Sequence, residues 1–164
     1  VSRLFWGPSG KVWKIRFTDV TESVGGREIN YPVLQSGGVI KAMAVFEDRQ
    51  GGLWIGNRTT RTVFYLRDGQ VTRYSEKEWG LKGIPLSPAM HDDEGGMWFT
   101  TALSLQEADG LVRFKDGGFT FYGQEHGLPQ AVYYSVWSDR EGAIWVGTSK
   151  GLYRLKRKLV VYPS

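Results

Sequence analysis

The sequence predicts an all-β fold made of repeated units, each with four short antiparallel strands. Aromatic residues make up 14% of the 164 residues and there are 22 glycines, a composition that favours strands joined by tight turns. One pattern, Asp-x-x-Gly-x-apolar-Trp, occurs three times, with its tryptophans 44 and 47 residues apart. No stretch of useful length has apolar residues at the helical spacing i, i+3, i+4, i+7. The three copies contain Asp48, Gly51 and Trp54, then Asp92, Gly95 and Trp98, then Asp139, Gly142 and Trp145.

Each copy of the pattern predicts a β-hairpin, because apolar, β-branched or aromatic residues lie on both sides of it. The Asp side chain can accept hydrogen bonds from backbone N–H groups one or two residues further on, which starts the turn. The Gly supplies a backbone conformation with positive φ at no steric cost. We therefore interpret these Asp residues as structural, and not as metal ligands or general bases.

The chain divides into four units in order. Residues 1–38 are predicted to form a degenerate partial unit, since residues 4–7 (Leu-Phe-Trp-Gly) resemble the second strand of the later units. Its first strand and turn are then missing, residues 12–15 form the next strand, and residues 27–31 form an outer strand. The complete units are residues 39–83 and 84–130, and the last unit is residues 131–164.

Strands are predicted at similar places within the later units. In residues 39–83 they cover 39–46, 53–56, 63–66 and 71–74. In residues 84–130 the first strand is weak because Pro85 and Pro88 surround it, and the others cover 97–100, 110–114 and 119–122. In residues 131–164 they cover 132–137, 144–147, 151–155 and 159–162, with a charged turn at 156–158. Four strands in about 45 residues is the scheme of a β-propeller blade, so the sequence predicts about three and a half blades, with the tryptophans packed between them.

The repeats resemble the two-component regulator propeller repeat. That repeat combines Asp-x-x-Gly-x-(Leu/Ile)-Trp-(Ile/Val)-Gly-Thr with a Gly-Leu-x-Arg-(Phe/Leu) strand and a Gly-Leu-Pro link. The matching segments here are residues 53–57, 110–114, 127–129, 144–148 and 151–155. The sequence departs from the pattern at residues 62–66 and at Thr100, which replaces the usual Gly. The resemblance covers residues 39–164 well and residues 1–38 weakly.

The resemblance implies a role in sensing. Such repeats form propellers in the periplasmic sensor region of bacterial histidine kinases and related regulators, where they help to detect ligands, in many cases glycans. We therefore expect a ligand- or partner-binding module of a two-component signalling protein, in the periplasm or otherwise outside the cytoplasm. The motif residues belong to the scaffold, so they do not identify the ligand.

The predicted number of blades is too small to close a ring, since propellers have about four to eight blades. An open array leaves an unpaired edge and apolar blade faces exposed. We therefore expect either self-association of two chains or further propeller blades. The chain begins with Val1, so we expect it to be a processed or excised piece.

Candidate ligand-binding residues lie in the links between strands two and three and between successive units, which share one face of a propeller. Arginine and aromatic side chains there would suit an acidic glycan. The alternative for each of these residues is an ordinary solvent-exposed loop side chain that binds no ligand. The candidates are Asn57, Arg58, Arg61, Trp79, Glu125, His126 and Lys150, accompanied by Glu78, Ser104, Gln106, Glu107 and Ser149.

Composition excludes several classes of site. The absence of cysteine excludes disulfides and thiolate metal sites, and we expect no cofactor and no metal. The net charge of +4 is not by itself evidence for nucleic-acid binding, and no apolar run is long enough for membrane insertion. We expect no enzymatic activity. The alternatives are a lyase-like propeller enzyme that uses His126 with a metal, and a purely structural assembly module.

Overall fold

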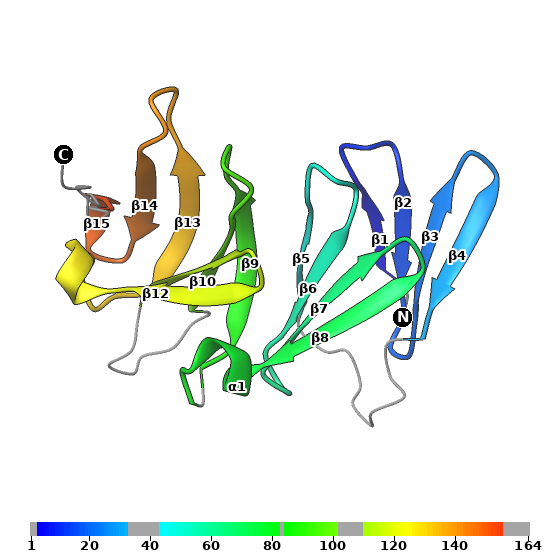
Figure 1. Ribbon diagram of the computed structural model, residues 1–164, viewed down its shortest axis with the longest axis horizontal. Coiled ribbons are helices and arrows are strands. Elements are labelled where there is room, and N and C mark those ends of the chain that lie inside the picture. Colours follow the sequence, from blue (N-terminus) through cyan, green and yellow to red (C-terminus); the bar gives the residue numbers. More distant parts are fainter. Residues whose placement is uncertain (1–2, 33–42, 83, 102–109, 156–164) are drawn as a thin grey trace, which may run out of the picture.

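The structure is a computed structural model that describes residues 3–32, 43–82, 84–101 and 110–155, and these residues form four antiparallel β-sheets. In each sheet, strands that are consecutive in the chain pair with each other. The sheets stand side by side like the blades of a fan, with hairpin turns along one edge and the helix α1 at the other (Figure 1). The predicted all-β fold of repeated blades is confirmed.

We number the sheets as blades 1 to 4. Blade 1 contains β1 (Arg3–Trp6), β2 (Val12–Ile15), β3 (Val20–Val24) and β4 (Arg27–Tyr31). Blade 2 contains β5 (Met43–Glu47), β6 (Leu53–Asn57), β7 (Thr62–Arg67) and β8 (Gln70–Ser75). Blade 3 contains β9 (Leu86–His91), β10 (Met97–Thr101), β11 (Leu111–Lys115) and β12 (Gly118–Tyr122). Blade 4 contains β13 (Tyr133–Ser138), β14 (Ile144–Thr148) and β15 (Gly151–Arg154).

Blade 1 is a complete four-stranded sheet, so the prediction of a partial unit that lacks its first strand and turn is wrong. Its first hairpin pairs Trp6 with Val12, and the Gly7 N–H donates to the Lys11 carbonyl at 2.9 Å. The corresponding bond in blade 2 runs from Asp48 to Gly52, also at 2.9 Å. Gly7 thus occupies the position of the repeat Asp, and without that Asp the sequence pattern does not indicate the turn.

The first strand of blade 3 forms despite its prolines. Pro88 lies within β9 opposite Phe99, where the pairing register between β9 and β10 shifts between Trp98 and Phe99. A bulge tolerates proline because the ladder lacks a regular hydrogen bond there. The weak strand predicted around residues 89–90 is therefore a full strand.

The links between blades contain the helical residues of the described chain. Helix α1 (Glu76–Trp79) joins blades 2 and 3, and the 3₁₀ turn η1 (Gln124–His126) joins blades 3 and 4. The Ser75 N–H donates to Glu78 Oε2 at 2.6 Å at the start of α1, and Gly80 ends it with φ of 77°. The sequence predicted no helix, since a single turn is too short to show a helical period. No helix within the described ranges is long and apolar enough to cross a membrane.

Some predicted features lie outside the described residues. They are the start of the first strand of blade 2 (residues 39–42), the last strand of blade 4 (residues 159–162) and the charged turn at residues 156–158. Each of the four predicted units contains one sheet.

The core consists of three junctions between successive blades. On each blade, one face bears the repeat tryptophan; we call it the Trp face and the other the opposite face. At every junction the Trp face of one blade packs on the opposite face of the next. The residue pairs that mark the junctions are Trp13 with Leu53, Trp54 with Phe99, and Trp98 with Val146.

The tryptophans therefore pack between blades as predicted, with Trp13, Trp54 and Trp98 at most 3% exposed. Trp145 lies on the Trp face of blade 4, which no described residue of another blade covers, and is only half-buried. The first strands β5, β9 and β13 of successive blades contact one another. These strands form the inner side of the array.

Candidate functional site

The repeat Asp residues organise the turns at one end of the inner strands. In blade 3, Asp92 Oδ1 accepts hydrogen bonds from the N–H groups of Glu94 at 2.9 Å and Gly96 at 2.8 Å. Asp92 Oδ2 accepts from Trp98 Nε1 at 2.7 Å and from Arg113 Nε at 2.9 Å. All four acceptor positions of the carboxylate are thus used, which confirms the structural interpretation and adds the indole bond.

The other two copies have the same geometry. The indole Nε1 of Trp54 donates to Asp48 at 3.2 Å and that of Trp145 donates to Asp139 at 2.9 Å. The constant spacing of six residues between Asp and Trp fits this bond. In blade 2, the Tyr65 hydroxyl donates to Asp48 Oδ2 at 2.7 Å, in the place that Arg113 occupies in blade 3.

Asp92 is strongly acidic in the fold. Burial, which leaves the residue 4% exposed, raises the pKa of its carboxyl. The hydrogen bonds from Arg113, Gly96 and Trp98 outweigh burial and lower the pKa to about 2. The charged form of Asp92 therefore stabilises blade 3 throughout the neutral and mildly acidic range.

In blade 1, the indole N–H of the tryptophan donates its hydrogen bond to a carboxylate of the next blade. Trp13 Nε1 donates to Glu47 Oε2 at 2.7 Å, and the Ser9 N–H donates to Glu47 Oε1 at 2.9 Å. A Cβ atom at Gly7 would overlap the Glu47 carboxylate. The missing Asp of blade 1 thus leaves room for a buried carboxylate of blade 2, which joins the two blades.

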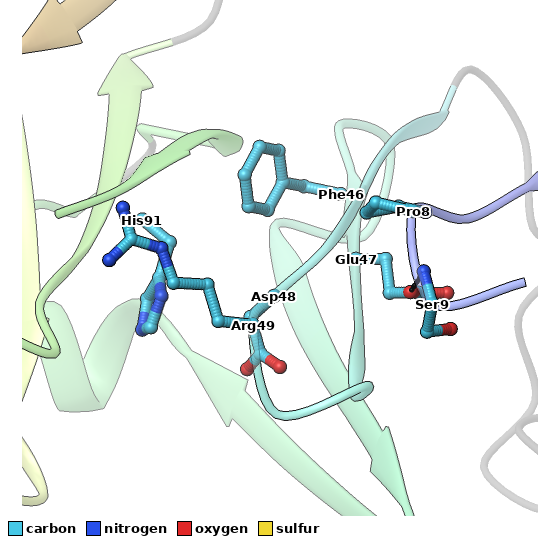
Figure 2. Close-up of a pocket in the computed structure, with 7 residues that line it drawn as sticks. All are labelled: Pro8, Ser9, Phe46, Glu47, Asp48, Arg49 and His91. Atoms are coloured by element: carbon cyan, nitrogen blue, oxygen red, sulfur yellow. Dashed lines mark hydrogen bonds between the residues drawn. The ribbon is translucent and has the colours of Figure 1, made fainter. Parts of the chain in front are cut away.

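A pocket of about 450 Å³ lies next to this joint. Its walls come from the first turn of blade 1, the first turn of blade 2 and the end of the inner strand of blade 3. We call it the turn pocket. Figure 2 shows the Arg49 side chain extending on the side of His91. Its lining residues are Pro8, Ser9, Phe46, Glu47, Asp48, Arg49 and His91.

In the turn pocket, the carboxylate acceptors already have hydrogen-bond partners within the fold, whereas some of the nitrogen atoms do not. Asp48 binds Trp54, Tyr65 and two backbone N–H groups, and both oxygens of Glu47 accept hydrogen bonds from blade 1. Arg49 uses Nη2 for Asp93 at 2.7 Å, which leaves further N–H donors on its guanidinium. His91 Nδ1 is buried and has no hydrogen-bond partner. The pocket therefore offers the remaining Arg49 donors and apolar surface to an incoming group.

Two of the residues predicted to bind a ligand have structural roles instead. Asn57 is 1% exposed, and its Oδ1 accepts from the N–H groups of Thr59 and Thr60 at 3.0 and 3.3 Å. Trp79 is 5% exposed, and its Nε1 donates to the Ile84 carbonyl at 3.1 Å. The prediction that Asn57 and Trp79 bind a ligand is wrong, because their polar atoms complete the links and are not free.

The remaining candidates are not brought together into one described pocket. Arg58, Arg61, Glu125 and Lys150 are exposed. His126 is half-buried, stands edge-on to Tyr122 with the ring centroids 4.8 Å apart, and has a buried Nδ1 without a partner. Ligand binding by these residues stays a prediction. Ser104, Gln106 and Glu107 lie outside the described residues.

The turn pocket lies at the end of the blades opposite to the links that the sequence analysis favoured. The sequence did contain one signal: Trp13 has no Asp six residues before it, so its indole needs another acceptor. Among the described residues, no group of three His, Asp or Glu side chains could hold a metal ion.

Comparisons with known proteins agree with the fold. The family model described as "Two component regulator propeller" matches residues 35–59. A comparison with curated protein sequences finds no match. The extracellular domain of the hybrid two-component system BT4673 from B. thetaiotaomicron superposes with a TM-score of 0.63 at 18% identity over 94% of this chain. Virginiamycin B lyase from Staphylococcus aureus, solved with quinupristin, superposes with a TM-score of 0.62 at 12% identity over 93% of this chain.

PorZ, a surface component of the type-IX secretion system of Porphyromonas gingivalis, is also similar, with a TM-score of 0.60 at 11% identity over 94% of this chain. At these identities the likeness shows the fold alone. The chain spans 54% of the lyase, 22% of the BT4673 domain and 26% of PorZ. This chain has the fold of a partial β-propeller, and its residues 35–59 match the two-component regulator propeller repeat.

Proposed function

We propose that this chain is a ligand-binding module of an extracytoplasmic two-component sensor, and that it binds an acidic glycan in the turn pocket. The family match and the likeness to extracellular domains of hybrid two-component systems support the sensor role. The observation on which the site rests is that Arg49, which keeps unused guanidinium donors, lines one pocket together with His91.

The chemistry of the pocket favours a ligand that accepts hydrogen bonds. Its own carboxylates, Glu47 and Asp48, are 3% and 5% exposed and saturated by internal donors. A carboxylate on a sugar ring would take charge-assisted bonds from Arg49 and a bond from His91. The rings of Phe46 and Pro8 would cover an apolar face of the same sugar.

The experiment is calorimetric titration with trigalacturonate, with the uncharged galactose trisaccharide as the comparison ligand. We expect saturable binding of the acidic sugar only. Arg49→Ala should weaken binding about 10- to 100-fold, as expected for a lost charge-assisted hydrogen bond. His91→Ala should weaken it in the same direction.

Matched control variants exist at the other end of the blades. Arg58 is exposed like Arg49, and His126 has an unpartnered Nδ1 like His91. If the ligand binds in the turn pocket, Arg58→Ala and His126→Ala bind like the unchanged chain. A loss in these two variants alone would instead favour the link residues that the sequence predicts. Equal loss in Arg49→Ala and Arg58→Ala, or equal binding of the two sugars, would overturn the proposal.

The lyase alternative has no specific support from the site. His126 has Tyr122 as its ring neighbour, and no metal-binding group of side chains includes it within the described chain. The likeness to the lyase is a likeness of fold. We therefore propose binding and sensing, not catalysis.

A further inference from the structure

The two outermost blades each present an uncovered face with large apolar side chains. On the opposite face of blade 1, Leu4 is 50% exposed and Trp6 is 67% exposed. On the Trp face of blade 4, Trp137 is 42% exposed and Leu152 is 58% exposed. Exposed apolar groups gathered on one surface indicate an interaction site.

Strand pairing shows that these residues share a face in each blade. Trp6 pairs with Val12 and Leu4 with Lys14, while Phe5 between them packs into the core between blades 1 and 2. In blade 4, Trp137 pairs with Trp145 and Leu152 pairs with Gly147, next to one another on β14. The side chains of Ile144 and Val146 point to the other side, into the core with blade 3.

The two uncovered faces are complementary by the rule that every internal junction follows. Each of the three junctions joins a Trp face to an opposite face. Blade 4 has a Trp face without a partner among the described residues, and blade 1 has an opposite face without one. Within the described residues, the chain thus has one uncovered face of each kind.

We propose that a second copy of this chain covers both faces, with blade 4 of each copy packed on blade 1 of the other. Four blades from each copy give about eight, within the four to eight blades of known propellers. The chain also spans 54% of the S. aureus lyase chain, whose fold it shares, so two copies match about the length of one such chain. Two identical junctions related by a two-fold axis then close the ring.

Light scattering after size exclusion tests the assembly with the chain as it exists. We expect a mass of about 37 kDa at micromolar concentration, twice the chain mass of 18.5 kDa. Trp6→Glu and Leu152→Glu should each raise the dimer dissociation constant at least 10-fold, since each places a charge in both junctions. Val71→Glu is the control, because Val71 is 38% exposed but lies on the outer strand β8 of blade 2.

Mixing the two variants distinguishes this ring from other dimers. In a mixed dimer of Trp6→Glu and Leu152→Glu chains, one junction has both changes and the other has neither. We expect the mixture to dimerise more tightly than either variant alone. A folded monomer of the unchanged chain, growth beyond the dimer, or sensitivity to Trp6→Glu alone would overturn the proposal, since the last indicates that blade 1 pairs with blade 1.

Discussion

The substitution Asp92→Asn tests whether the repeat carboxylate stabilises its blade through four specific hydrogen bonds. Asn retains an oxygen for the N–H groups of Glu94 and Gly96, which lie at 2.9 and 2.8 Å. Its amide nitrogen then faces Trp98 Nε1 and Arg113 Nε, which are both donors. The change leaves two buried donors without an acceptor and removes an ion pair in which Arg113 is 11% exposed.

We expect Asp92→Asn to lower the free energy of unfolding by about 3 to 5 kcal/mol, the usual cost of breaking a buried ion pair. Chemical denaturation followed by tryptophan fluorescence at pH 7 and at one protein concentration measures it. Asp139→Asn is the matched control, because Asp139 makes the same turn on the uncovered face of blade 4. Its effect should be less than half as large, and equal effects in both variants would refute the reasoning.

The pH dependence gives a second check on the same carboxyl. The pKa of Asp92 falls from 3.8 to about 2 in the fold, which corresponds to roughly 2 kcal/mol of stabilisation at neutral pH. Because the folded pKa is the lower one, this stabilisation is present above pH 4 and is lost as the pH falls toward 2. The difference in stability between the unchanged chain and Asp92→Asn should therefore shrink over that interval, and a constant difference would contradict the assignment.

Three further results are expected. Gly7→Ala should lower the melting temperature, since the new Cβ would overlap the Glu47 carboxylate. Gly118→Ala is the control and should change it little, because the nearest atom to its Cβ lies 3.8 Å away. Equal shifts in the two variants would contradict the bond between the blades. Trp79→Ala should cost about 3 to 5 kcal/mol of unfolding free energy by denaturant titration and leave trigalacturonate affinity unchanged, whereas a loss of affinity without a loss of stability would restore Trp79 as a ligand residue. Glu47→Gln should cost about 1 to 3 kcal/mol by the same titration, because its amide keeps only one acceptor for the two donors Trp13 Nε1 and Ser9 N–H. No cost would contradict the buried joint between blades 1 and 2.

The fold was predictable because the repeat places its information in local turns. Asp48 and Gly51 determine a hairpin by themselves, and Trp54 follows at a spacing that the indole bond requires. Blade 1 was incompletely predicted because Gly7 replaces the repeat Asp. The carboxylate that accepts the Trp13 indole bond instead belongs to Glu47, which is 34 residues after Trp13. A contact at that separation leaves no periodic signal.

The candidate site was less predictable than the fold. The turn pocket combines Pro8, Arg49 and His91 from three blades, and no residue pattern within one repeat marks such a meeting point. Asn57 and Trp79 were chosen for their chemistry, but burial had already committed their polar atoms to the backbone. Where side chains converge depends on how blades pack, which single-sequence periodicity does not determine.

The most direct test of the proposed site uses the only two histidines of the chain. His91 lines the turn pocket and His126 lies in a link at the other end of the blades, so their imidazole C–H signals in a nuclear magnetic resonance spectrum report on one end each. During titration with trigalacturonate we expect the His91 signal to move and saturate while the His126 signal stays in place, and Arg49→Ala to suppress the change. Movement of the His126 signal alone, or of neither signal, would contradict binding in the turn pocket.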